Sequence, residues 1–339
     1  MTIYITSKTS LNGYSLCSEI HTVKTCFKGY MMNTTIVSRF WLVLAFFAIY
    51  FVWGTTYLAN LYALKAIPPF VISALRYLVA GLLLALLAYG KSQAWPQKKE
   101  IRDLAISGVL MLVGGSGLVV VAEQYITSGS AAVIVATEPL WFVLLDQPRW
   151  KLYFSNGKII AGLLIGFAGV VLFAQMAPAN SPQQDQSTNQ FLGTVIVLVG
   201  AILWVSGTLF AARRIKPGRY NLWHTTIQLV AAGLFATFLA MVNGEWNRFV
   251  WLAVPLPAWG GLAFLILFGS LIAYLAFAWL VTVQPPAIVS THTYINPLIA
   301  VLIGWLAAGE AVTGLQVVAL IVVLTGVVLT QLSKIQAGG

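Results

Sequence analysis

The sequence predicts an all-α membrane protein with ten transmembrane helices, arranged as two inverted five-helix repeats. Apolar residues make up 59% of the 339 positions and charged residues only 8%, which is the composition of a polytopic helical membrane protein. Apolar stretches of about 20 residues recur along the chain, and each is long enough to cross a hydrocarbon core about 30 Å thick. A polar residue and a proline also interrupt two of these stretches, at 136–140 and 294–298. Interrupted helices at corresponding places in two halves indicate a duplicated transport fold.

The apolar runs define five expected spans in each half of the chain. Those of the first half are 40–61, 69–89, 104–125, 129–145 and 159–176, and those of the second are 191–212, 222–242, 259–281, 286–308 and 313–332. The expected domains are a polar, disordered tail (1–38), the first repeat (39–176), a linker (177–190), the second repeat (191–333) and a short tail (334–339). Because five is an odd number, the second repeat must enter the membrane from the opposite side, which makes the repeats inverted.

The basic residues determine the expected orientation of these spans. Sixteen of the 19 Lys and Arg residues fall on one side of the predicted membrane and only Lys65 and Arg248 on the other, while Arg76 lies inside a span. Basic loops stay in the cytoplasm, so both termini are expected there, in a multi-pass protein of the cell inner membrane. The net charge of +10 is therefore read as topology beside anionic lipid, and no nucleic-acid partner is expected.

The segment before the first span contains both cysteines, Cys17 and Cys26. They lie on the predicted reducing side, where a structural disulfide is not expected. No apolar run of signal-peptide length precedes the first span, so no cleaved leader is expected. The pair Met31 and Met32 suggests the hypothesis that translation naturally begins there.

Several short motifs occur along the chain in a specific order and spacing. In the first half they are Trp53-Gly54-Thr55-Thr56, Pro68-Pro69, Arg76-Tyr77, Ala80-Gly81, Ala122-Glu123, Ser128-Gly129 and Glu138-Pro139; in the second half they are Gly269-Ser270, Asn296-Pro297, Gly309-Glu310 and Gly326-Val327. Together they resemble the drug/metabolite transporter superfamily, in particular the ten-helix exporters with two EamA-type domains. The resemblance implies a secondary transporter that exports small metabolites, amino-acid-like compounds or drugs through a central cavity between the halves. One departure is that the first half has Leu152-Tyr153 where the Gly-Glu pair would recur.

Glu138 is the first candidate for substrate binding or proton coupling. It lies 9 residues into its span, or about 14 Å deep at 1.5 Å per residue. An ionisable group near the bilayer centre is a functional candidate by default, and here it is a candidate proton carrier, the alternative being a paired structural carboxyl. Arg76 lies about 10 Å inside its own span and cannot lose its proton. A structural ion pair with Glu138 or Glu123 is favoured for it over a bond to a substrate carboxylate.

Asn296 and His292 lie one turn apart on the last interrupted helix. They place donors and acceptors beside the carbonyl of Thr293, which Pro297 leaves without its helical donor. Asn296 could bind substrate or link helices, with equal weight for both. His292 is a second-rank candidate, because a lone histidine is more often a satisfied core residue.

Four aromatic residues lie deeper than the interfacial belts and could line a cavity: Trp53, Tyr57, Trp141 and Trp204. They could bind apolar or cationic molecules, although helix packing is the more common role. The cavity is expected to be lined by the first, second, fourth, sixth and ninth spans. Glycines at 162, 166, 169 and 326 predict a close contact between the fifth and tenth spans.

Two other classes of function compete with transport. An intramembrane enzyme acting on lipid is disfavoured, because the spans contain no metal-binding His-Glu-x-x-His pair, nucleophile elbow or cysteine–histidine combination. A non-transporting scaffold would not require polar residues at matching depth in both halves. No catalytic residue, metal or cofactor is expected. The sequence contains no ATP-binding loop, so the energy for transport must come from a gradient or from exchange. Protons are the expected coupling ion. The expected oligomeric state is a monomer or a homodimer.

Overall fold

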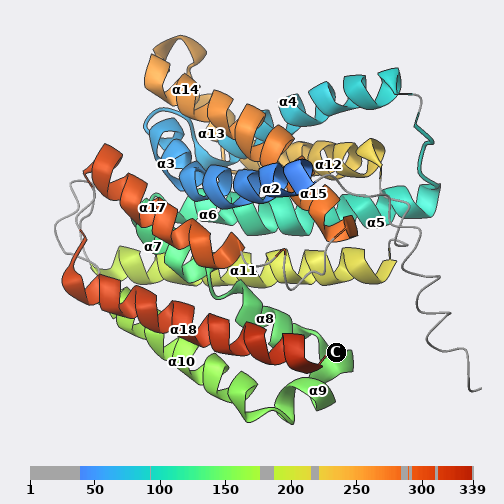
Figure 1. Ribbon diagram of the computed structural model, residues 1–339. Coiled ribbons are helices and arrows are strands. Elements are labelled where there is room, and N and C mark those ends of the chain that lie inside the picture. The colour runs from blue at the N-terminus through green and yellow to red at the C-terminus, as the bar shows by residue number, and fades with distance from the viewer. Residues whose placement is uncertain are drawn as a thin grey trace, which may run out of the picture. The chain divides into compact units, whose positions relative to one another are not determined.

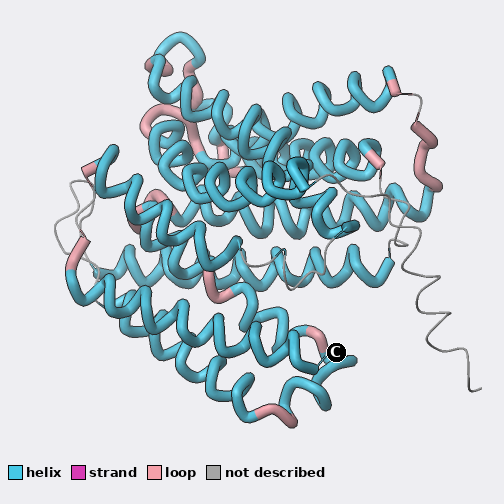
Figure 2. Tube along the Cα trace, viewed as in Figure 1, coloured by secondary structure: helices cyan, strands magenta, loops and turns pink. Residues whose placement is uncertain are grey.

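Helices and their connecting loops make up all the described part of the chain, which is residues 39–91, 93–175, 187–214, 221–283, 289, 292–309 and 312–337 of a computed structural model (Figures 1 and 2). The expected N-terminal tail, both cysteines and Glu310 lie outside these residues, as does most of the expected linker. Residues 43–339 form one compact unit, and the contacts given below lie within it.

The first half contains five long helical stretches, three of them made of consecutive pieces. They are α2 (Arg39–Phe47), η1 (Ala48–Val52) and α3 (Trp53–Leu64); α4 (Pro69–Gly90); α5 (Lys98–Gly108), η2 (Val109–Gly117) and α6 (Leu118–Ala122); α7 (Ser128–Val135) and α8 (Glu138–Leu145); and α10 (Gly157–Gln175). The short helices η3 (Gln147–Arg149) and α9 (Trp150–Phe154) connect α8 to α10.

The second half repeats this order. Its long stretches are α11 (Ser187–Arg214); α12 (Leu222–Val242); α14 (Leu256–Phe264), η5 (Leu265–Ala273) and α15 (Tyr274–Val283); α17 (His292–Ala308); and α18 (Gly314–Ala337). The short helices α13 (Glu245–Arg248) and η4 (Trp251–Ala253) join α12 to α14. α11 begins at Ser187, inside the expected linker, and α18 ends five residues beyond the expected last span.

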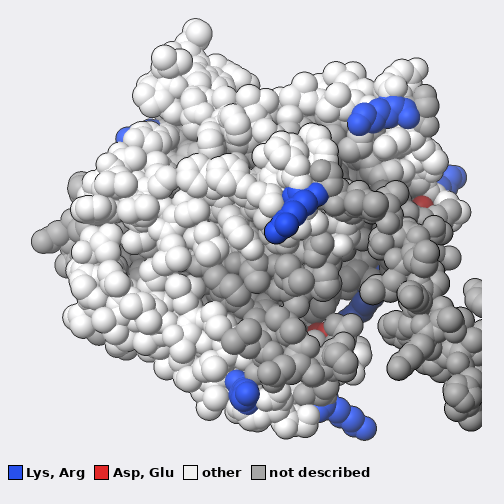
Figure 3. All heavy atoms as spheres, in the orientation of Figure 1, with Lys and Arg blue, Asp and Glu red and all other residues white. Residues whose placement is uncertain are grey.

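Length and hydropathy show that this is a membrane protein fold. Among the described residues, seven helical stretches are long and apolar enough to cross a membrane, and three shorter apolar helices cover Gly157–Gly169, Ile295–Ala308 and Gly314–Gly326. Large apolar side chains such as Leu82, Phe191 and Leu306 are exposed, as lipid-facing side chains must be. The face drawn in Figure 3 accordingly carries few charged side chains, most of them Lys or Arg.

The two halves pack against each other through corresponding helices. α4 packs against α12, and α10 packs against α18, as Figure 1 shows for α10 and α18. α3 of the first half packs against α14 of the second, and α11 of the second half packs in return against η2 and α6 of the first. α17 contacts both α3 and α7. Each of these helices therefore touches the other half.

Glycines allow the closest of these contacts. A Cβ atom on Gly326 of α18 would lie 2.6 Å from the carbonyl oxygen of Gly162 on α10 and would also meet the backbone of Gly166. A Cβ on Gly169 would lie 2.7 Å from the backbone nitrogen of Val323. The predicted contact between the fifth and tenth spans is confirmed, and it depends on backbones that touch without side chains between them.

Side chains from connecting segments of the other half cap two helices at their N-termini: Glu245 begins the short helix α13, and Gln93 lies in the loop after α4. The Glu245 carboxylate accepts hydrogen bonds from the backbone N–H groups of Phe70 (2.8 Å) and Val71 (3.1 Å) in the first turn of α4. The Gln93 side-chain oxygen accepts one from the backbone N–H of Leu222 at 2.8 Å, in the first turn of α12. These bonds satisfy donors that a helix cannot pair internally.

Candidate functional site: a buried polar cavity

Described residues from helices of both halves line a cavity of about 90 Å³, called here the central cavity. Nineteen residues line it: Trp53, Thr56, Tyr57, Asn60, Arg76, Leu112, Gly115, Ser116, Val119, Val135, Glu138, Gly200, Ala201, Trp204, Gly269, Ser270, Tyr274, His292 and Asn296. The volume suffices for several water molecules but is below the roughly 300 Å³ of a pocket for a drug-sized ligand. In this conformation the cavity is therefore narrow.

The structure brings seven of the eight candidate side chains to this cavity. They are Trp53, Tyr57, Arg76, Glu138, Trp204, His292 and Asn296. Trp141 is not among the lining residues. Its indole N–H donates to the Thr137 hydroxyl at 3.2 Å, and its ring packs edge-on against Phe167 at 5.4 Å. Trp141 thus has the packing role that is the more common one for such a residue.

One face of α3 supplies four of the lining residues. Trp53, Thr56, Tyr57 and Asn60 are spaced by three or four residues, so they share one face of the helix. Asn60 is only 3% exposed, and its side-chain oxygen has no hydrogen-bond partner among the described residues. A buried acceptor of this kind is costly unless a ligand or water reaches it.

Arg76 on α4 is buried against hydroxyl groups. Its Nε donates to the Ser270 hydroxyl at 2.8 Å and its Nη1 to the Ser116 hydroxyl at 3.4 Å. Gly269 leaves space for the guanidinium, because a Cβ there would lie 3.1 Å from Arg76 Nη2. The sequence favoured an ion pair for Arg76. Among the described side chains, its contacts are instead these hydroxyl groups and the ring of Tyr77, which lies 5.2 Å away. Neutral contacts leave the charge of the guanidinium uncompensated by these neighbours and directed at the cavity.

Glu138 lies where the fourth stretch is broken. α7 ends at Val135, and α8 begins at Glu138 with Pro139 in its first turn, as expected for a residue that cannot donate a helical hydrogen bond. The side chain is 7% exposed and faces the central cavity.

Asn296 and His292 lie side by side on α17 but contact different neighbours. With its amide nitrogen turned toward the nearby carbonyls, Asn296 donates to Tyr50 (2.8 Å), Ile49 (3.1 Å) and His292 (3.1 Å). Ile49 and Tyr50 belong to η1, so these contacts favour the helix-linking role for Asn296. The His292 Nδ1 lies 3.1 Å from the Val289 carbonyl, and its ring packs 5.1 Å from that of Trp53.

An aromatic wall closes one side of the cavity. Trp53 meets Trp204 edge-on at 6.0 Å and packs 5.2 Å from Phe277. The Trp53 indole N–H donates to the Gly269 carbonyl at 3.2 Å, and the Tyr274 hydroxyl is held by Gln228 at 2.9 Å. Because these polar groups are already bonded to protein, the rings offer mainly their apolar faces to a ligand.

The third and eighth spans are walls of the cavity that the sequence did not predict. Ser116 lies in η2, whereas Gly269 and Ser270 lie in η5; both are π-helical segments at corresponding places in the two halves. Such wide turns are frequent at functional sites. Hydropathy does not reveal them, although Gly269-Ser270 is one of the motifs that carry the family resemblance. Among the described residues no group of His, Cys, Asp and Glu side chains is arranged to hold a metal ion.

The fold and the cavity define a polytopic helical membrane protein with a buried polar site between its helices. The model of the EamA-like transporter family matches the chain twice, at residues 40–175 and 191–332. The chain therefore belongs to the EamA-like transporter family, with two EamA repeats, and is a multi-pass inner membrane transporter. A small-molecule substrate and a lipid environment follow from that class.

Relatives agree with this assignment. The chain is 31% identical over 296 residues to a protein named as the uncharacterized inner membrane transporter YedA of Escherichia coli strain K12, a match covering 86% of this chain and 90% of YedA. It is 24% identical over 277 residues to the uncharacterized transporter YoaV of Bacillus subtilis, covering 80% and 90% of the two chains. A solved crystal structure matches with a TM-score of 0.58 at 19% identity, covering 88% of this chain and 99% of that one; at this identity the likeness establishes the fold alone.

Proposed function

We propose that this protein exports small metabolites, amino-acid-like compounds or drugs by alternating access, in exchange for protons carried by Glu138. The observation that carries the proposal is that a buried guanidinium, Arg76, and a buried carboxyl, Glu138, face one cavity lined by both repeats. Ionisable groups in a membrane interior usually mark a substrate or ion path. The two groups offer an anion site and a cation site in the same small space.

Alternating access also needs two halves that can move against each other. We infer ten spans, the seven long helices and the three shorter apolar ones, in two inverted repeats with both termini in the cytoplasm. The reciprocal packing supports this arrangement, because exchanging the halves converts the contact of α3 with α14 into that of α11 with η2 and α6. It also pairs α4 with α12 and α10 with α18, as a two-fold axis would.

Glu138 is the proposed coupling group, because a carboxyl can carry a proton whereas Arg76 stays charged. The substrate and the proton would occupy the cavity in turn. The protein would then change the side to which the cavity opens only when one of them is bound. The small volume of the cavity, about 90 Å³, fits this use by one of them at a time.

Reconstituted transport tests the proposal. Metabolites released by cells with and without the protein would identify substrates, which are then measured by counterflow in proteoliposomes. Glu138→Gln is expected to retain exchange of substrate for substrate and to lose uptake driven by a pH gradient. The matched control is Glu100→Gln. The Glu100 carboxylate lies outside the cavity lining and accepts a hydrogen bond from the backbone N–H of Gln97. Unchanged pH-driven uptake in the Glu138 variant would contradict proton coupling through this residue, and absence of any counterflow would contradict transport.

A further inference from the structure

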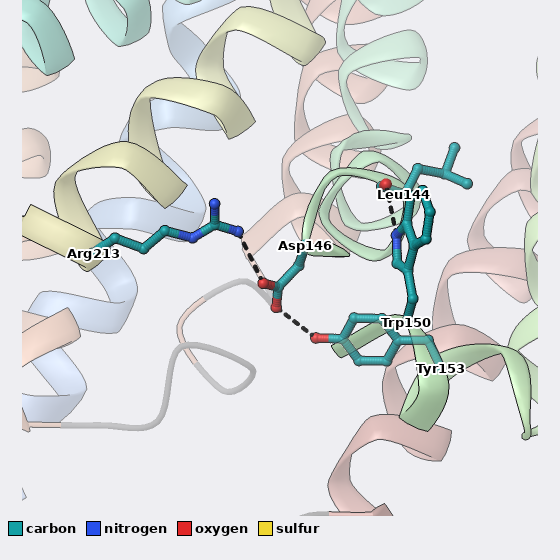
Figure 4. A network of polar contacts seen from close by, with 5 residues as sticks. All are labelled: Leu144, Asp146, Trp150, Tyr153 and Arg213. Atoms are coloured by element: carbon teal, nitrogen blue, oxygen red, sulfur yellow. Dashed lines mark hydrogen bonds and ion pairs between the residues drawn. The ribbon is translucent and has the colours of Figure 1, made fainter. Parts of the chain in front are cut away.

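A polar cluster away from the central cavity joins the two repeats. Asp146 follows directly after α8, and its carboxylate accepts a hydrogen bond and ion pair from Arg213 Nη2 at 3.2 Å. The hydroxyl of Tyr153 on α9 donates to the other carboxylate oxygen at 2.9 Å (Figure 4). Arg213 lies at the end of α11, in the second repeat. The charge pair therefore connects segments that belong to different halves of the protein.

The helices that this cluster joins are walls of the central cavity. α8 carries Glu138 eight residues before Asp146, and α11 carries Trp204 nine residues before Arg213. At 1.5 Å per residue the cluster lies about 12 to 14 Å along the helices from those groups. α8 and α11 also contact each other directly. Asp146 and Arg213 thus join two helices that both supply residues to the cavity lining.

The opposite end has a corresponding contact of a different kind. Tyr62 lies nine residues after Trp53, as Arg213 lies nine residues after Trp204. The Tyr62 hydroxyl donates to the Ala307 carbonyl, at the end of α17, at 3.3 Å. Here an exposed neutral hydrogen bond joins α3 to α17, where the other end has an ion pair to a carboxylate whose side chain is only 10% exposed. In this structure each end therefore has a polar contact between the two halves.

We propose that Asp146, Tyr153 and Arg213 form a gate that closes one end of the central cavity and must separate once in each transport cycle. This proposal rests on the alternating access proposed above. A partly buried ion pair with a second hydrogen bond is stronger than one exposed neutral bond. The gate at Asp146 therefore makes the resting protein open more readily at the Tyr62 end.

Sided cysteine labelling tests the gate without a known substrate. Cys17 and Cys26 are first replaced by serine, and Ala201, a small cavity residue on α11, is changed to cysteine as the reporter. The probe is a membrane-impermeant sulfonated maleimide, which is too large for a cavity of about 90 Å³. It is applied to right-side-out and to inside-out vesicles. A separate variant, with its cysteine at exposed Lys158 near the start of α10, identifies the vesicle face on the Asp146 side.

In the reporter background, Asp146→Asn and Arg213→Ala are each expected to raise the labelling rate roughly 3- to 10-fold from the Asp146 side and not from the other. Tyr153→Phe should give a smaller increase on the same side. The control is Arg214→Ala, because neighbouring Arg214 packs over the ring of Phe210 at 5.4 Å instead of pairing with Asp146. It should leave both rates unchanged.

The sidedness separates a gate from simple loss of stability. Equal increases from both faces, or no increase in the Asp146 and Arg213 variants, would overturn the proposed gate. A one-sided increase in a protein that shows no substrate counterflow would retain the gate and remove the transport proposal, so the two failures are distinguishable.

Discussion

Gln93 and Glu245 occupy corresponding places in the two repeats, and each caps a helix of the other repeat. Gln93 lies three residues after the end of α4 and accepts from the first turn of α12, whereas Glu245 lies three residues after the end of α12 and accepts from the first turn of α4. Because each repeat caps a helix of the other, α4 and α12 are joined by hydrogen bonds at both ends of their contact. Polar caps are especially valuable near a membrane, where water is scarce.

We expect Gln93→Ala and Glu245→Ala each to lower the free energy of unfolding by about 1 kcal/mol, the usual value of a helix cap. The two caps lie at opposite ends of α4, so their effects should add in the double variant. Thermal unfolding in detergent measures this, with the exposed Lys91→Ala as the control. A double variant no less stable than either single variant would show that the caps are not independent.

The stability of the Glu245 cap should depend on pH. Burial raises the pKa of Glu245 above its ordinary value of 4.5, an effect that the hydrogen bonds from Val71 and Phe70 and the charge of Arg248 only partly offset. The folded state therefore binds the proton more tightly than the unfolded chain does. The stability that this tighter proton binding adds to the folded state is fully present below pH 4.5. It is lost as the pH rises through the raised pKa of Glu245. Over this range Glu245→Gln should show a flatter profile of melting temperature against pH than the parent protein. Parallel profiles would rule the linkage out.

The contact of α10 with α18 should not tolerate a methyl group. Gly326→Ala places a Cβ against backbone atoms of Gly162 and Gly166, which cannot move as a flexible side chain can. Overpacking of this kind costs about 1 to 3 kcal/mol. Gly314→Ala is the matched control on α18, because a Cβ there would meet nothing within 4 Å. Similar melting temperatures for the two variants would contradict the tight backbone contact at Gly326.

Two tryptophans that look alike in the sequence should behave differently. Trp53→Leu removes a ring of the cavity wall and its hydrogen bond to Gly269. We expect its substrate transport to fall by about tenfold or more, the effect of losing about 1.4 kcal/mol of binding. Trp141→Leu alters a ring that packs on Phe167 outside the lining. Its main effect should be on the melting temperature. The comparison uses counterflow normalised to folded protein, and an equal loss of transport in both variants would argue against a special role for the cavity wall.

Much of the candidate site could be predicted because its residues are chemically conspicuous in their surroundings. Arg76, Glu138, Asn296 and His292 are polar residues inside apolar runs, and such residues must face the protein interior or water. The Glu138-Pro139 motif likewise indicated the break before α8. The break expected at Asn296-Pro297 is not found, because α17 continues through Pro297 as one helix from His292 to Ala308. Asn60 was missed because an isolated amide near a span end gives no signal without its neighbours.

The sequence by itself determined the class of this protein, the approximate place of its helices and which polar groups had to be withdrawn from lipid, because hydropathy and burial of charge are properties of each segment alone. Only the tertiary structure decided the partners of those groups. Arg76 contacts Ser116 and Ser270, 40 and 194 residues away, and Trp141 turns from the cavity that Glu138 faces. Helical periodicity defines the faces of one helix, but the rotation of that helix against its neighbours depends on packing between segments far apart in the chain.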